Sequence, residues 1–287
     1  MTNGRIPVLK TYKLYVAGEF PRSESGRSYE VRAADGSFLA NAAAASRKDA
    51  RDAVAAALKA QPGWAAATAY NRGQVLYRMA EMMETRTADL AAVCGGRDEV
   101  ERSIDRVVWY AGWADKIAQV LGSSNPVAAP YFNFTIPEPT GVVGVVAPER
   151  SSLLGLVSRV APVLVGGNSA VVIASETRPL PAVTLTEVLA TSDVPSGVVN
   201  VLTGYKRELV PVLASHVDVD AIDVWGVPDA LRVEAERSAA DNVKRVARRP
   251  RGVSDARFDW LDDARAERPE WIASYLEMKT VWHPVGV

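Results

Sequence analysis

The chain has 287 residues, with 33 basic and 34 acidic side chains, one cysteine and two histidines. This length can bury a substantial core, and the balanced charge argues against nonspecific binding to nucleic acid or to an anionic membrane. The single cysteine excludes an internal disulfide framework and fits a cytoplasmic location, while so few histidines leave little for a zinc site. No apolar run has the length of a signal peptide at the start or of a membrane span elsewhere.

The first 42 residues predict short strands. A mostly apolar run from Tyr12 ends at Gly18, and Asp35-Gly36 lies between two candidate strands. An aspartate-glycine pair in that position predicts a hairpin turn.

Helices are predicted next along the chain. Ser46, with Asp49 three residues later, has the pattern of an N-terminal capping box before an alanine-rich helix. Apolar residues at helical spacing predict two more helices, over about 68–85 and about 98–120. We interpret the apolar stripes of these helices as core.

From Gly141 onward the pattern changes to short apolar runs rich in β-branched residues, as in strands buried on both faces. Five strands are predicted, over 142–147, 170–174, 198–202, about 221–225 and about 244–248. Because helical stretches separate these runs, the sequence predicts an α/β fold with a parallel, right-handed sheet.

Residues 249–270 mix proline, glycine and dense charge of both signs, and we predict a linker or a short exposed helix there. The basic residues around Arg248 suggest nucleic acid, but the aspartates that follow favour a solvated connection. The segment 275–285 predicts a strand. The aromatic residues near this end are dense, and we predict that they form a contact surface; they are Trp260, Trp271, Tyr275 and Trp282.

Six segments, in chain order, resemble the aldehyde dehydrogenase superfamily. They are YKLYVAGEF, GVVGVVAP, APVLVGGN with SETRPL, PSGVVNVLTG with HVDVDAIDVWG, SAADNVKRV, and YLEMKTVW near the C-terminus. The resemblance implies a Rossmann-like parallel sheet with flanking helices, plus a small β oligomerisation arm. It implies an N-terminal and coenzyme-binding domain at 1–121 and 141–249, an arm at 122–140 and 271–287, and a linker at 250–270 that replaces the catalytic domain.

In the family, a cysteine thiolate attacks the aldehyde, hydride passes to nicotinamide, and a glutamate activates water. An asparagine stabilises the oxyanion. Cys94, the only cysteine, precedes the sheet and is interpreted as a buried structural thiol. The resemblance aligns the family's asparagine-containing triplet with Pro148-Glu149-Arg150, which has no asparagine. The family's glutamate motif is expected after Val246, where this chain has ARRPRG instead. No catalytic residue is therefore predicted.

The resemblance also implies an altered site for NAD or NADP. The family's lysine before the ribose-binding glutamate is Ile173 here, and Gly226 is followed by Val227 and Pro228 in place of a serine. Lost hydrogen bonds predict coenzyme binding that is weak or lost. The residues predicted to remain at this degenerate site are Pro148, Glu176, Gly204 and Gly226. Glu176 is equally well explained as a surface acid, and the glycines as turn residues.

The arm elements match the family, whereas the reactive groups do not. This contrast predicts a catalytically inactive subunit that associates with a full-length NAD(P)-dependent aldehyde dehydrogenase, with neither nucleic acid nor membrane as a partner. Two alternatives stay open at this point. One is an active oxidoreductase on aldehydes with an altered site, and the other is a weak nucleotide-binding regulator.

Overall fold

The computed structural model describes residues 10–250 and 252–286. At its centre is a parallel sheet of five strands in the order β10-β9-β6-β7-β8. The strands are β6 (Val142–Val146), β7 (Ser169–Ile173), β8 (Val199–Leu202), β9 (Ala221–Asp223) and β10 (Arg245–Ala247). Every residue of β6 and β7 is buried, as expected for apolar runs covered on both faces. The predicted α/β class and all five predicted strands are confirmed.

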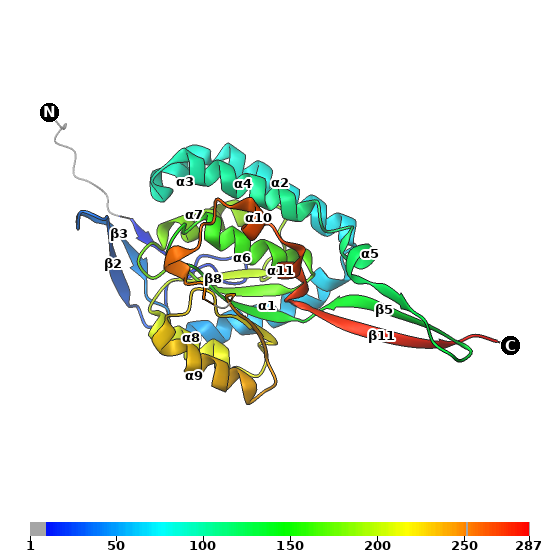
Figure 1. Ribbon diagram of the computed structural model, residues 1–287. Helices are drawn as coiled ribbons and strands as arrows, with labels where there is room; N and C mark the ends of the chain where they lie inside the picture. Colours follow the sequence, from blue (N-terminus) through cyan, green and yellow to red (C-terminus); the bar gives the residue numbers. More distant parts are fainter. Residues whose placement is uncertain (1–9, 251, 287) are drawn as a thin grey trace.

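Helices cover both faces of this sheet (Figure 1). One face carries α6 (Leu154–Val165) and α7 (Leu180–Leu189), with an outer layer of α2 (Ala69–Thr85), α3 (Thr87–Cys94) and α4 (Arg97–Ala111). The other face carries α1 (Arg47–Ala66), α8 (Lys206–Ser215) and α9 (Asp229–Ala240). Among the described residues, no helix is both long and apolar enough to cross a membrane.

Local signals set the helix ends. The capping box is present, since the Ser46 hydroxyl accepts the Asp49 N–H at 3.2 Å and the Asp49 carboxylate accepts the Ser46 N–H at 2.7 Å. The single helix predicted over about 98–120 is wrong, because α4 ends at Ala111 and a separate short helix, α5 (Ile117–Leu121), follows. Gly112 is the cap of α4, and glycine is a poor residue for continuing a helix.

A second sheet, in the order β1-β3-β2, is built from β1 (Thr11–Tyr12), β2 (Ser28–Arg32) and β3 (Phe38–Ala43). The hairpin predicted at Asp35-Gly36 joins β2 to β3. The strand predicted from Tyr12 to Gly18 is only partly present. Beyond Tyr12 the chain crosses to the edge of the large sheet, where Tyr15 exchanges two backbone hydrogen bonds with Val201.

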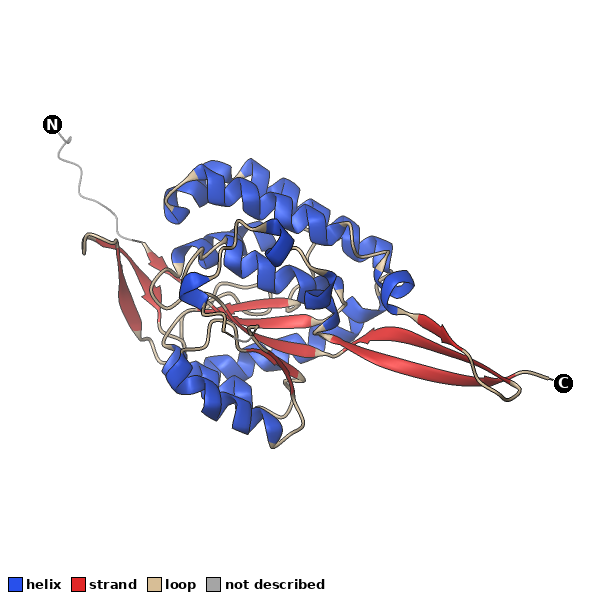
Figure 2. Cartoon of the chain, in the orientation of Figure 1, coloured by secondary structure: helices blue, strands red, loops and turns tan. Residues whose placement is uncertain are grey.

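The two segments predicted to form the arm, 122–140 and the C-terminal strand, build a third sheet in the order β11-β5-β4. Its strands are β4 (Ser123–Asn125), β5 (Tyr131–Pro139) and β11 (Leu276–Pro284). Strands β5 and β11 pair antiparallel over their whole length, from Leu276 opposite Pro139 to Pro284 opposite Tyr131. The arm projects away from the rest of the molecule, with the end of β11 near its tip (Figures 1 and 2).

The segment between β10 and β11 is not an exposed connection. It contains a 3-10 turn, η1 (Asp255–Arg257), and two short helices, α10 (Asp263–Ala266) and α11 (Pro269–Ala273). Trp260, Ala266 and Ile272 in this segment are buried. The short helix predicted as an alternative is present as α10, but the predicted exposure is wrong for the apolar residues of the segment, which supply part of the core.

The aromatic residues of this region also pack inward. Trp260 lies against Trp225 and Phe258, with ring centroids 5.1 and 4.7 Å apart. Tyr275 is fully buried, and its hydroxyl donates to Asp223 at 2.6 Å. The prediction of an aromatic contact surface is wrong for these residues, and only Trp282, on the arm, is largely exposed among the four.

Candidate functional site

The candidate site lies at the carboxyl edge of the parallel sheet, where open α/β sheets bind their ligands. Four loops meet there, at 147–151 after β6, 174–178 after β7, 203–206 after β8 and 224–228 after β9. The predicted remnants of the coenzyme site are distributed one to each loop, as Pro148, Glu176, Gly204 and Gly226. The topology thus brings these loops to one edge of the sheet.

A buried lysine, Lys206, occupies the middle of this edge. Its side chain is only 2% exposed. Its ammonium group donates to the carbonyl oxygens of Ala147 at 2.8 Å and Gly226 at 2.9 Å, and forms an ion pair with Glu149. Lys206 therefore links the loops after β6, β8 and β9. Sequence reasoning missed it, although its position two residues after Gly204 places it at a strand's carboxyl end.

Glu149 is the partner of Lys206 and joins the loop after β6 to the loop after β7. Its carboxylate accepts the Ser175 hydroxyl at 2.7 Å, the Glu176 N–H at 3.0 Å, and both the N–H and the hydroxyl of Thr177, at 3.1 and 2.8 Å. Burial by itself would raise the pKa of Glu149, but the charge and hydrogen bond of Lys206 outweigh burial and lower this pKa to about 2. Glu149 is thus a carboxylate fixed in its charged state.

Of the predicted remnants, Glu176 joins this network through its side chain. The Glu176 carboxylate accepts the Lys206 N–H at 2.9 Å, at the start of α8. At Gly226 a side chain is excluded, since a Cβ atom would lie 2.0 Å from the Ala147 carbonyl oxygen. Gly204 has φ +143°, which favours glycine, and Pro148 is buried. Each residue has a structural role, and their assignment to a coenzyme stays a prediction.

The segment after β10 closes over this edge. The Asp255 carboxylate accepts the Glu149 N–H at 2.9 Å, and Arg150 donates to the Ala256 carbonyl oxygen. Burial raises the pKa of Asp255. The Trp260 ring lies against Gly155 in α6, where a Cβ atom would meet it at 3.2 Å. The segment after β10 therefore covers the carboxyl end of β6.

Cys94 ends α3, in the outer helical layer. Its side chain is buried, and burial raises the pKa of the thiol to about 12. At neutral pH the sulfur is a protonated thiol, which is a poor nucleophile. The interpretation of Cys94 as a buried structural thiol is confirmed.

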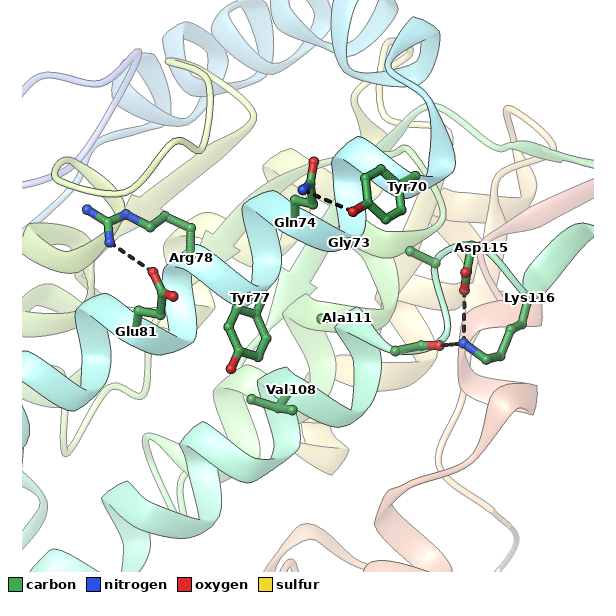
Figure 3. Close-up of a pocket in the computed structure, with 12 residues that line it drawn as sticks. Tyr70, Gly73, Gln74, Tyr77, Arg78, Glu81, Val108, Ala111, Asp115 and Lys116 are labelled. Atoms are coloured by element: carbon green, nitrogen blue, oxygen red, sulfur yellow. Dashed lines mark hydrogen bonds and ion pairs between the residues drawn. The ribbon is translucent and has the colours of Figure 1, made fainter.

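The outer helical layer and the carboxyl edge each carry a surface pocket. One, of about 590 Å³, lies between α2 and α4 (Figure 3). Tyr77 and Val108 face one another across it. Its charged lining residues are already paired, Arg78 with Glu81 at 2.8 Å and Lys116 with Asp115 at 2.9 Å.

The other pocket, of about 810 Å³, opens directly above the Glu149 network and is called the arginine pocket below. It lies between the β2–β3 hairpin, the loops after β6 and β7, and residues 257–261. Its lining includes four arginines, Arg32, Arg150, Arg178 and Arg257.

Known proteins are similar to this chain in sequence and in fold. The profile of the Aldehyde dehydrogenase family matches residues 20–254. Retinal dehydrogenase 2 of Mus musculus is 33% identical over 252 residues, which cover 83% of this chain and 48% of that enzyme. Cytosolic 10-formyltetrahydrofolate dehydrogenase of Pongo abelii is 33% identical, over 85% of this chain and 28% of that protein.

Solved structures agree with the sequence matches. PnpE from Pseudomonas sp. WBC-3 superimposes with a TM-score of 0.77 at 30% identity, over 83% of this chain and 50% of that one. The NAD+ complex of an aldehyde dehydrogenase from Bacillus cereus has a TM-score of 0.76 at 25% identity, with the same coverage of 83% and 50%. The chain thus spans about half the length of the retinal and Bacillus enzymes. With its family profile matched over residues 20–254 and this fold, the chain belongs to the aldehyde dehydrogenase family.

Proposed function

We propose that this chain is a catalytically inactive member of the aldehyde dehydrogenase family that associates, through its arm, with a full-length aldehyde dehydrogenase subunit. The observation that carries the proposal is the contrast between the two ends of the sheet. The carboxyl edge is filled by Lys206 and Glu149. The arm, in contrast, leaves large apolar side chains exposed on β5 and β11, namely Tyr131, Phe132, Ile136, Met278 and Trp282.

Coenzyme binding is proposed to be weak or lost. Relatives of this chain bind NAD, as the Bacillus cereus complex states in its name. The residues at this edge do not fit a dinucleotide, because the Lys206 ammonium already bonds the two loop carbonyls that meet there. Ile173 has no side-chain donor for a ribose, and Pro228, directly before α9, has no N–H for a phosphate. Titration with NAD and NADP is expected to show no saturation below about millimolar concentration.

The absence of a reactive thiol supports the same conclusion. Cys94 is buried, and its thiol is protonated at neutral pH. We therefore expect no aldehyde-dependent NADH formation by this chain alone. Turnover that is lost in Cys94→Ala would overturn the proposal and establish an altered active site instead.

The geometry of the arm supports a protein partner. Strand β11 is the outermost strand of the order β11-β5-β4, so one side of its backbone has no strand partner within the chain as described. A long edge strand of this kind is a template for pairing with a strand of another subunit. Exposed apolar side chains of β5 and β11 add surface that a partner can bury. Cytosolic relatives support the cytoplasm as the compartment.

Co-expression of the tagged chain with full-length aldehyde dehydrogenases from the same cells, followed by capture and native mass measurement, tests the association. The expected result is a complex of fixed stoichiometry that contains both chains. Recovery of a stable monomer under every co-expression condition would contradict the proposal.

A further inference from the structure

The arginine pocket carries an inference that is independent of the arm and of the coenzyme. We propose that this pocket binds a small polyanion that bears phosphate groups. Its volume of about 810 Å³ is within the range of small-molecule sites. The four lining arginines come from four separate segments, so their charges surround the opening rather than follow one helix face.

Two of the arginines are available to a ligand. Arg178 and Arg257 are exposed residues, and in the part of the chain that the structure describes neither side chain has an ion pair or a hydrogen bond. Arg150 donates to a backbone carbonyl and keeps its full positive charge. Arg32 is paired with Glu30 at the rim.

The acidic residues of the pocket are engaged elsewhere. Glu149 is neutralised by Lys206 and by the donors of 175–177. The Glu99 carboxylate accepts the N–H groups of Leu153 and Leu154, at 3.0 and 3.2 Å. Asp259 is the remaining lining carboxylate among the described residues, and one of its oxygens accepts the Leu261 N–H at 3.0 Å. The pocket therefore presents an excess of positive charge.

Glu149 also fixes the positions of the arginines. Arg178 directly follows Thr177, whose N–H and hydroxyl bind the Glu149 carboxylate. The η1 turn that ends at Arg257 is held by Asp255, which accepts the Glu149 N–H. Arg150 directly follows Glu149 in the chain. Glu149 thus fixes the backbone of the segments that carry these arginines, through its carboxylate at Thr177 and its N–H at Asp255, and guanidinium groups gathered around one opening suit bidentate binding of phosphate oxygens.

Isothermal titration of the full chain with inorganic tripolyphosphate tests this site. We expect saturable binding that weakens as salt is raised. The double variant Arg178→Gln/Arg257→Gln should lose affinity on the order of tenfold per arginine, or about a hundredfold in total. The matched control is Arg47→Gln/Arg51→Gln on α1, which removes the same charge from exposed residues outside the pocket.

The control variant should bind tripolyphosphate as the wild type does, and circular dichroism establishes that both variants are folded. Equal affinity in the two double variants would show that only net charge matters and would overturn the proposal, as would absence of binding at millimolar tripolyphosphate. Citrate that binds as tightly as tripolyphosphate would overturn the assignment to phosphate. None of these outcomes depends on the association of the arm with a partner.

Discussion

Glu149 determines how the carboxyl edge responds to acid. Its pKa in the folded chain is about 2, below the ordinary value of about 4.5. A carboxyl group with a lowered folded-state pKa stabilises the fold above its ordinary pKa, and that stability is lost as the pH falls toward the folded value. The free energy of unfolding contributed by Glu149 is therefore complete at neutral pH and decreases between about pH 4.5 and about pH 2.

We predict that Glu149→Gln lowers the free energy of unfolding by about 2 kcal/mol near neutral pH, a value discounted for solvent screening. The side chain of Glu149 is 33% exposed, which is the reason for the discount. Urea unfolding of wild type and variant should show this gap shrinking near about pH 3, where the wild-type carboxylate begins to protonate. Glu84→Gln, at an exposed carboxylate without an ion pair among the described residues, is the control. A gap of equal size at both pH values would contradict the prediction.

Cys94 permits a prediction about chemical reactivity. With a thiol pKa raised to about 12 by burial, very little thiolate exists at neutral pH. We predict that iodoacetamide alkylates the native chain at least about a hundredfold more slowly than the urea-unfolded chain. Mass spectrometry of the alkylated protein measures both rates. Rapid, complete alkylation of the folded chain would show that the thiol is accessible and ionised, contrary to its placement at the end of α3.

At the scale of elements, Arg106 holds the segment between β10 and β11 against α4. Its fully buried guanidinium donates to the Ser158 hydroxyl at 2.6 Å and the Trp260 carbonyl at 3.1 Å, and pairs with Asp263 and Glu267 at 2.9 and 3.1 Å. Removing Arg106 leaves a cavity and takes the donors from the Ser158 and Trp260 oxygens, and the partly exposed carboxylates of Asp263 and Glu267 lose their counter-charge. This one side chain therefore joins α4, α6 and α10.

We predict that Arg106→Ala destabilises the chain by about 3–5 kcal/mol and exposes the segment 255–267 to trypsin. Arg102→Ala is the matched control, since Arg102 lies one turn earlier on α4, is exposed, and is 3.7 Å from Asp263. A surface pair of that kind contributes at most about 1 kcal/mol. Urea unfolding and the rate of tryptic cleavage report the two effects. Similar losses in the two variants would show that burial of Arg106 is not what holds the segment.

The elements that the sequence predicted well are those with a strong local pattern. The buried strands from Val142 onward, the capping box at Ser46 and the Asp35-Gly36 hairpin are all set by residues close in sequence. The packing of residues 250–270 was not predictable in this way. Its charged residues indicate an exposed linker, whereas in the fold Asp263 and Glu267 pair with the buried Arg106, which lies more than a hundred positions earlier in the chain.

The same reasoning applies to the candidate site. The sequence located the carboxyl-edge loops correctly, because strand ends are local features. It did not reveal that Lys206 and Glu149 pair, since that contact joins loops separated by more than fifty residues. A buried lysine cannot be distinguished from a solvated one by its neighbours in the chain. The pairing depends on the order of the strands, which sets those loops side by side.

At the scale of the whole molecule, mutation can separate the binding of a partner by the arm from the stability of the body. The body contains the sheet and its helices, while the arm extends from it and exposes most of β11 (Figure 2). Trp282 is 59% exposed and contacts Tyr131 edge-on at 5.9 Å, within the arm. A charge placed there disturbs a partner's approach but removes little that the chain itself buries.

We predict that Trp282→Asp abolishes capture of a full-length aldehyde dehydrogenase subunit while it lowers the free energy of unfolding by less than about 1 kcal/mol. Val217→Asp, at a 74% exposed residue of the body, is the matched control and should leave capture unchanged. Capture from co-expressing cells and urea unfolding of the isolated variants give the two measurements. If Trp282→Asp and Val217→Asp capture the partner equally well, the arm is not the surface that binds it, and association would have to use the body instead.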